Sequence, residues 1–258
     1  MKKTVYVAIL FVFISIMSGA SFAADSGALY QVSTLGALQE GFYDGVISLD
    51  VLKDKGDFGI GTFDSLDGEM LLLDGVFYQV RSDGHVYLPA GNTLTPFAEV
   101  IWFKEDMTLP ISRSFTYKGL TGLIETAFPS RNLPYAVRVD GEFSYVKTRS
   151  VPAQVKPFSR LAEVVKTQPV FEMKNIKGTI IGFWLPQFYG GINMPGFHLH
   201  FISADKKSGG HLLDCSITSG TVLVEYIHNT SLTLPEKSDF FKLDLDKTDK
   251  KELEKIEK

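Results

Sequence analysis

Short apolar runs separated by turn-forming residues constrain the fold of this chain more than any other feature. In residues 69–80, the runs Glu69-Met-Leu-Leu-Leu73 and Val76-Phe-Tyr-Gln-Val80 flank the pair Asp74-Gly75. An Asp-Gly pair suits the positive φ angles of a type I′ turn, so the segment predicts a β-hairpin. Ser82-Asp83-Gly84 then turns the chain into a third run at 85–88. The pattern predicts a largely antiparallel, strand-rich fold with a few helices.

The rest of the chain continues the alternation of short strands and turns. Residues 116–128 differ, because their apolar residues have helical spacing and Pro129 follows them. A short amphipathic helix is expected at 158–166, and the charged tail 244–258 is expected to be either helical or mobile. Further strands are expected at 96–103, 135–139, 142–151, 178–185, 197–202, 211–217 and 221–227, with a turn at Asp140-Gly141 between the second and the third.

Residues 1–23 have the layout of a secretory signal peptide. Met1-Lys2-Lys3 precedes an apolar run at 5–17, which is followed by the mostly small residues 18–23. The run is shorter than the roughly 20 apolar residues of a membrane-spanning helix, and no later stretch is long and apolar enough to span. We therefore expect cleavage after Ala23 and an exported mature chain, in a periplasm or in the medium, without a membrane anchor.

The charge balance argues against nucleic acid as a partner. The chain has 26 basic and 30 acidic residues, and loss of Lys2 and Lys3 would make it more acidic. No basic stripe is present that could neutralise phosphates. Cys215 is the only cysteine, so no intramolecular disulfide can form. We interpret Cys215 as a small buried strand residue rather than a nucleophile.

The strongest local signal is a cluster of histidines, since three of the five lie between positions 198 and 211. His198 and His200 are two residues apart in a strand-like run, so their side chains leave the same face. The turn-forming segment 203–210 should return the chain antiparallel. If Ile202 lies opposite His211, the third imidazole joins the same face, whereas a slip of one residue would send it to the other face.

Three converging neutral imidazoles match a catalytic zinc site, which leaves a coordination position open for water or substrate. Imidazole also binds iron, copper, nickel and manganese, so the residues alone leave the metal open. The alternative makes each histidine a hydrogen-bonded core or rim residue. We assign that structural role to His85 and His228, which are isolated in strand contexts.

Arg149 and Glu69 are further candidates. Arg149 alternates with Phe143 and Tyr145 along one strand face, and its guanidinium could hold a substrate carboxylate through two hydrogen bonds. A surface ion pair is the alternative. Glu69 opens a strand that is apolar on both faces, where burial would favour its protonated form and suit it to proton transfer or metal ligation. The alternative is a strand-end carboxylate that reaches solvent.

Taken together, the segments from about Leu29 to beyond Asp239 resemble the acetolactate decarboxylase family. The combination of Pro195-Gly-Phe-His-Leu-His-Phe201 with Ser208-Gly-Gly-His211 is the most specific part of the match. The other matching segments are Gly56-Asp-Phe-Gly-Ile-Gly-Thr62, Asp64-Ser-Leu-Asp-Gly-Glu-Met70, Tyr135-Ala-Val-Arg138, Lys147-Thr-Arg-Ser-Val-Pro152 and Gly178-Thr-Ile-Ile-Gly-Phe183.

The resemblance implies a set of site residues and a fold. The family's zinc ligands fall on His198, His200 and His211, and its other active-site residues fall on Glu69, Arg149, Thr62 and Glu257. The match to Glu257 lies in a poorly matching tail, for which a frayed charged terminus is the alternative. The implied fold is a two-domain α/β (α+β) homodimer: a mixed-sheet N-terminal domain at 24–165, a β-rich antiparallel C-terminal domain at 166–243 carrying the metal site, and a charged tail at 244–258.

The expected activity is zinc-dependent decarboxylation of 2-acetolactate to (R)-acetoin. Zinc would chelate the hydroxyl and keto oxygens and act as a Lewis acid on the developing enediolate. Arg149 would orient the carboxylate, and Glu69, together with Glu257, would manage the proton that reaches carbon. No organic cofactor is expected, because the sequence has neither a dinucleotide fingerprint nor a phosphate loop.

Two other functions remain open at the level of sequence. A cupin-like metal-dependent oxygenase also begins its site with His-x-His on a strand, although its usual following glutamate is replaced here by Asp205 at best. An exported metal-binding module would use the histidines alone and would leave Arg149 and Glu69 without a role. Iron-dependent oxygen consumption would favour the first, and zinc binding without turnover of acetolactate would favour the second.

Overall fold

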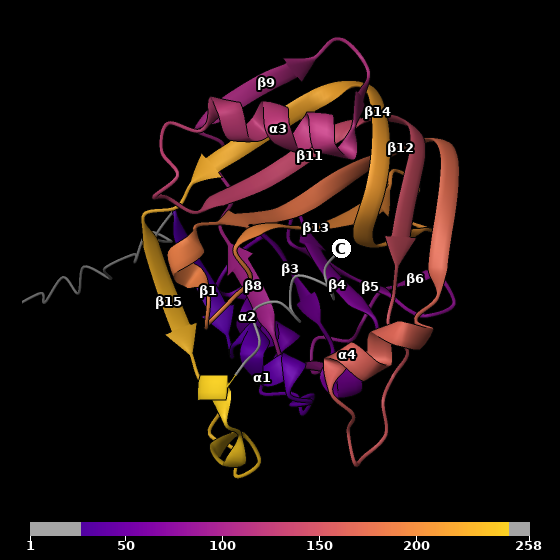
Figure 1. The fold of residues 1–258 in the computed structure, drawn as a ribbon. Helices are drawn as coiled ribbons and strands as arrows, with labels where there is room; N and C mark the ends of the chain where they lie inside the picture. The colour runs from indigo at the N-terminus through magenta and orange to yellow at the C-terminus, as the bar shows by residue number, and fades with distance from the viewer. Residues whose placement is uncertain (1–26, 248–258) are drawn as a thin grey trace, which may run out of the picture.

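Two β-sheets face each other in the computed structural model, which describes residues 27–247 (Figure 1). The first sheet has seven strands in the order β15 (Asn229–Thr233), β1 (Ala28–Val32), β8 (Ala98–Ile101), β3 (Phe58–Thr62), β4 (Glu69–Leu73), β5 (Val76–Val80) and β6 (Val86–Tyr87). Its strands pair antiparallel except β1 and β15, which are parallel, so this sheet is mixed.

The second sheet is wholly antiparallel and contains the three longest strands. Its order is β10 (Phe115–Thr116), β14 (Gly209–Tyr226), β11 (Tyr135–Arg149), β12 (Val170–Leu185) and β13 (Gly196–Ser203). Strand β14 also pairs with β9 (Met107–Ile111) and β13. A separate pair is formed by β2 (Ile47–Ser48) and β7 (Leu94–Thr95).

The helices of the described residues are few, as expected, and they cover the outer faces and one end of the two sheets. They are α1 (Leu35–Gln39), α2 (Leu49–Lys53), α3 (Tyr117–Ala127) and α4 (Leu161–Val164), and five 3-10 segments are η1 (Asp64–Leu66), η2 (Val165–Thr167), η3 (Gln187–Tyr189), η4 (Phe240–Lys242) and η5 (Leu245–Lys247). Helix α3 confirms the helix predicted at 116–128 and begins after Thr116, whose side chain accepts a hydrogen bond from Gly119 N. The helix predicted at 158–166 is shorter, and it continues as η2.

The predicted hairpin at 69–80 is present as β4 and β5. Leu73 lies opposite Val76, and Asp74 and Gly75 have φ angles of 52° and 76°. Two consecutive positive φ angles are the geometry of a type I′ turn, whose twist matches that of the two strands. The Asp-Gly pair was therefore interpreted correctly at this position.

The same interpretation was wrong at Asp140-Gly141, because β11 runs through this pair without a turn, and β14 runs through Gly220 in the same way. Gly141 lies opposite both Gly178 and Gly220, so three glycines form a row across adjacent strands. A Cβ atom on Gly141 would lie 2.6 Å from Ser219 O. These glycines therefore permit close strand packing and, with the nearby β-bulges, bending of long strands.

Alternation along the strands separates the core into layers. Leu199, Phe201 and Leu212 pack with α3 on the outer face of the second sheet. Ile181, Phe183 and Ile202, from the other face of that sheet, pack between the sheets with side chains such as Phe58, Ile60 and Leu71. Helix α2 packs with the outer face of the first sheet through Leu49 and Leu52. Side chains at His198, His200 and His211 therefore face the first sheet.

The boundary between the sheets does not coincide with the position predicted for a domain boundary, residue 165. Strands β9, β10 and β11 precede this position but belong to the histidine-bearing sheet, whereas β15 follows it and belongs to the first sheet.

Among the helices within residues 27–247, none combines the length and apolar character needed to cross a membrane.

Candidate active site

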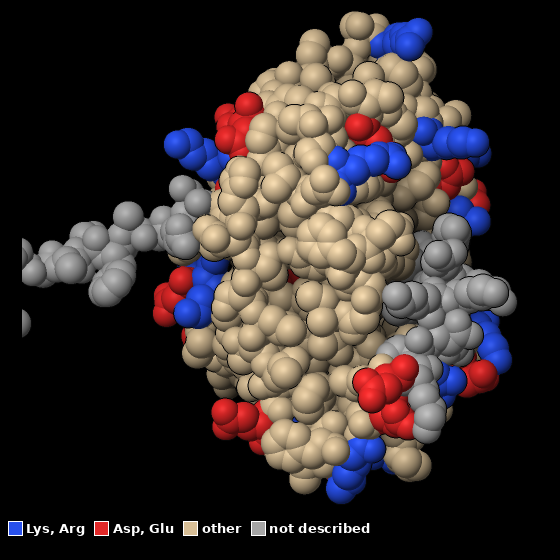
Figure 2. All heavy atoms as spheres, turned by 60° about the vertical axis from the view of Figure 1, so that its left-hand side comes forward, with Lys and Arg blue, Asp and Glu red and all other residues tan. Residues whose placement is uncertain are grey.

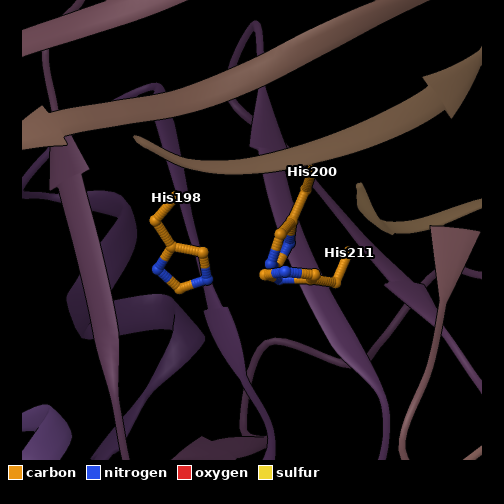
Figure 3. A group of neighbouring side chains, drawn as sticks. All are labelled: His198, His200 and His211. Carbon is orange, nitrogen blue, oxygen red and sulfur yellow. The ribbon is translucent and has the colours of Figure 1, made fainter. Parts of the chain in front are cut away.

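Two adjacent strands bring the three clustered histidines together, with His198 and His200 on β13 and His211 on β14 (Figure 3). His211 lies opposite His200 rather than Ile202, so the expected register was wrong by two residues. A shift of two preserves the face, and the expected convergence is therefore confirmed. One potential ligand atom from each ring lies within 4.8 Å of the others, and the ring centroids are 5.2–5.4 Å apart.

His200 is held in the form that a metal ligand requires. Its Nδ1 lies 2.9 Å from Met70 O on the facing sheet and donates a hydrogen bond to this carbonyl. Burial holds the pKa of His200 well below its usual value; electrostatic interactions with His198 and Arg149 also lower this pKa, whereas the hydrogen bond to Met70 O raises it. The ring is therefore neutral, and its Nε2, for which the described residues provide no hydrogen bond, keeps a lone pair directed into the cluster.

Arg149 extends the cluster along the sheet. It lies opposite His211, which in turn lies opposite His200, so the three residues form one row across β11, β14 and β13. The Arg149 residue is only 4% exposed, which excludes the surface ion pair considered above. Its guanidinium donates a hydrogen bond of 3.0 Å to Gln168 Oε1, in the segment that follows α4.

Glu69 and Thr62 approach the histidines from the facing sheet, where they lie opposite each other on β4 and β3. Glu69 Oε2 lies 3.5 Å from His200 Nε2, and the residue is 8% exposed, so it does not reach into solvent as a strand-end carboxylate would. Thr62 is also buried and donates a hydrogen bond of 2.7 Å to Gly68 O. Both sheets thus contribute polar groups to one place.

Most of these groups line a pocket with one polar wall and one apolar wall. The polar wall has Thr62, Glu69, Arg149, His198 and His211. The apolar wall comes from α1, α4 and nearby segments, namely Leu35, Leu38, Gly61, Leu66, Phe97, Val151, Leu161 and Val165. The arrangement suits a small ligand with oxygen atoms at one end and alkyl groups at the other.

Sequence reasoning missed two residues near the histidines. Glu99 on β8 is fully buried, and its Oε1 lies 3.7 Å from His198 Nδ1. Glu99 is the single carboxylate inside the apolar run at 96–103, and this isolated charge in a predicted strand could have identified it as a candidate. Gln168, the partner of Arg149, gave no signal, because an isolated glutamine in a loop has no distinctive pattern.

The remaining candidates lie apart from the pocket or outside the described residues. His85 and His228 are exposed, and neither lines the pocket. Cys215 is buried as expected, and burial raises the pKa of its thiol to about 12, so it is no nucleophile at neutral pH. Glu257 and the predicted signal peptide lie outside residues 27–247.

Comparisons with known proteins agree with this geometry. The family model described as alpha-acetolactate decarboxylase matches residues 29–247. The alpha-acetolactate decarboxylase of Methanosarcina mazei is 47% identical over 90% of this chain and 81% of its own length. That of Bacillus licheniformis is 44% identical over 86% of this chain and 87% of its own length.

A solved structure is similar over nearly the same region. The crystal structure of alpha-acetolactate decarboxylase from Bacillus subtilis superposes with a TM-score of 0.87 at 43% identity, covering 89% of this chain and 99% of that one. The identities and coverage extend well beyond the histidine hairpin and include both sheets. The chain belongs to the alpha-acetolactate decarboxylase family.

Proposed function

We propose that this chain decarboxylates 2-acetolactate to (R)-acetoin with zinc held by His198, His200 and His211. Family membership supports decarboxylation of acetolactate. The observation that supports metal dependence is the convergence of three buried imidazoles, two of which line one pocket together with an arginine and a carboxylate. A site that only sequestered metal would not need this arginine and carboxylate.

The histidine cluster fits zinc by the chemistry of its donors. Three neutral nitrogen ligands would leave open coordination positions for substrate oxygens and would keep the full double charge of a zinc ion. His200 meets this requirement directly, since its Nε2 is buried, neutral and directed into the cluster. Bound zinc would supply a Lewis acid that stabilises negative charge on the enediolate oxygens as carbon dioxide leaves.

The protein's own groups would position the substrate and move its proton. Arg149 would bind the carboxylate through two N–H groups, with Gln168 fixing the guanidinium. Glu69, whose Oε2 lies 3.5 Å from His200 Nε2 and which belongs to the polar wall of the pocket, would deliver a proton to one face of the carbon, which gives a single acetoin enantiomer. Thr62 would line the same wall, and Glu257 of the tail would assist Glu69 in proton transfer.

An acetoin assay with racemic acetolactate tests this function. The wild-type protein should form (R)-acetoin, and both exhaustive chelation and the His198→Ala substitution should reduce the rate to near background. Zinc should restore activity to the chelated wild-type protein but not to the variant. Activity that survives chelation or the substitution would remove zinc from the proposal.

The proposal also includes export after removal of residues 1–23 and a homodimer. Support for the dimer comes from β15, which ends the first sheet and pairs on one side with β1 in the described part of the chain. Figure 2 shows few charged side chains over the middle of the face that carries β15. Sheet extension across this edge would satisfy its backbone groups, and light scattering of the mature protein tests for two subunits.

A further inference from the structure

One buried carboxylate near the histidines takes no part in the reaction proposed above. The Glu99 side chain on β8 has no exposed surface, and neither of its oxygens accepts a hydrogen bond from the residues that the structure describes. A carboxylate that is removed from water needs hydrogen bonds or a nearby positive charge, because its desolvation is otherwise strongly unfavourable. Glu99 therefore calls for a compensating group.

The side chains around Glu99 indicate which group could compensate for its buried carboxylate. Gln31, opposite Glu99 on β1, donates from its side-chain amide to two backbone carbonyls at 2.8 and 3.0 Å, so both its N–H groups are used. Ile60, opposite Glu99 on β3, is apolar. The hydroxyl of nearby Tyr189 lies 2.6 Å from a threonine hydroxyl, with which it forms a hydrogen bond. The imidazole of His198 is the remaining polar group near the carboxylate, with its Nδ1 3.7 Å from Glu99 Oε1, and it could donate a hydrogen bond to Glu99.

The orientation of His198 indicates what Glu99 does. Its Nδ1 is the nitrogen nearest to Glu99, and Figure 3 shows the other ring nitrogen pointing toward His200 and His211. His200 has the same arrangement with a different partner, since its Nδ1 donates to Met70 O while Nε2 points into the cluster. In both His198 and His200, one ring nitrogen therefore points toward the other histidines and the second ring nitrogen faces an oxygen atom of the first sheet.

We propose that Glu99 is the positioning residue of His198 and part of the metal site's charge balance. Its carboxylate would accept the Nδ1–H hydrogen bond of His198, fix the tautomer that leaves Nε2 for the ion, and offset positive charge at the cluster. Outer carboxylates of this kind orient ligating histidines and raise their basicity. The inference rests on the proposed function, in that the three histidines must hold a metal.

Zinc affinity measured by competition with a chromophoric chelator tests this role. Loss of an outer partner lowers metal affinity by about 10- to 100-fold, so Glu99→Gln and Glu99→Met should both bind zinc more weakly than wild type. Glutamine keeps an acceptor oxygen, so Glu99→Gln should lose less zinc affinity than Glu99→Met. Glu99→Gln keeps an acceptor for the His198 Nδ1–H and removes a buried charge, so the melting temperature of this variant without metal should not fall.

Glu225→Gln provides the matched control. Glu225 is also a buried carboxylate, 2% exposed, but it lies at the opposite end of β14 from His211, so its substitution should leave zinc affinity unchanged. Failure of the wild-type protein to bind zinc would overturn both this inference and the proposed function. Zinc binding by the wild type with equal affinity in either Glu99 variant would overturn this inference alone, as would a lower melting temperature without loss of affinity.

Discussion

Arg149, His211 and His200 form a row across three adjacent strands, and this row fixes the spacing between the guanidinium and two of the three clustered imidazoles. Side chains that lie opposite each other in antiparallel strands have Cβ atoms about 4.5–5.5 Å apart. Thr62 and Glu69 form a second pair of opposite residues on the facing sheet. Rigid strands, rather than loops, therefore set the distances between these groups.

The geometry of the Arg149 guanidinium can be tested with a charge-preserving change. Arg149→Lys keeps the positive charge but loses the planar pair of donors, so kcat/KM for acetolactate should fall by about 10- to 100-fold, the equivalent of one charged hydrogen bond. Arg138→Lys is the matched control, because Arg138 lies on the same strand and pairs with Asp74 and Asp140 outside the pocket. Equal kcat/KM values for Arg149→Lys and the control would contradict the proposed carboxylate contact.

Kinetic measurements combined with metal analysis can distinguish a role of Glu69 in proton transfer from a role as a metal ligand. Glu69→Gln preserves the size of the side chain but cannot transfer a proton, so kcat should fall by about 10²- to 10⁴-fold while the zinc content stays that of the wild type. Steady-state kinetics and metal analysis of the same sample provide both measurements. Loss of zinc together with activity would instead make Glu69 a ligand, and full activity would leave it without a catalytic role.

At the scale of elements, Asp-Gly and Gly-rich segments have two different roles that local sequence cannot separate. At 74–75 the pair forms a turn, whereas Gly141 lies in a row of glycines within long strands. The difference depends on which strand lies alongside, since a Cβ atom on Gly220 would meet Asp140 O at 2.4 Å. The hairpin at β4 and β5 could be predicted because its determinants are adjacent in the sequence.

Alanine substitutions of two glycines should therefore have opposite effects on stability. Gly220→Ala introduces a backbone clash inside the second sheet and should lower the free energy of unfolding by about 1–3 kcal/mol. Gly122→Ala on α3 meets nothing within 4 Å and should raise it by about 0.5–1 kcal/mol. Urea unfolding monitored by circular dichroism measures both. A Gly220→Ala protein as stable as the wild type would contradict close packing at the glycine row.

Strand β14 also carries a source of pH-dependent stability at its far end. Burial raises the pKa of Glu225 to about 7 from 4.5, and nearby Asp106 and Asp57 act in the same direction. The folded protein keeps this proton where the unfolded chain loses it, so the stabilisation present below pH 4.5 is lost as the pH rises through about 7.

Glu225→Gln should remove this dependence. The melting temperature of the variant relative to wild type should increase between about pH 5 and pH 8, whatever the difference at the lower pH, because glutamine stays neutral throughout. Differential scanning calorimetry at several pH values in a metal-free buffer checks the prediction. A difference that does not change with pH would contradict the raised pKa.

At the scale of the whole molecule, the part of the site that could be predicted lies within one hairpin. His198, His200 and His211 are close in sequence, and strand periodicity was sufficient to place them on one face even with a register error of two residues. Glu99 and its relation to His198 depend on how two sheets face each other, which is set by contacts between distant segments such as β8 and β13. The return of β15 to the first sheet is equally non-local.

Zinc titration of the metal-free protein, followed by acetoin formation from acetolactate, tests the central claim most directly. Activity should be near background without metal, rise in proportion to added zinc and level off at one equivalent per chain, because one cluster of three imidazoles supplies the site. His200→Ala should stay inactive across the whole titration. Full activity before any zinc is added, or an activity that does not respond to zinc, would contradict the account.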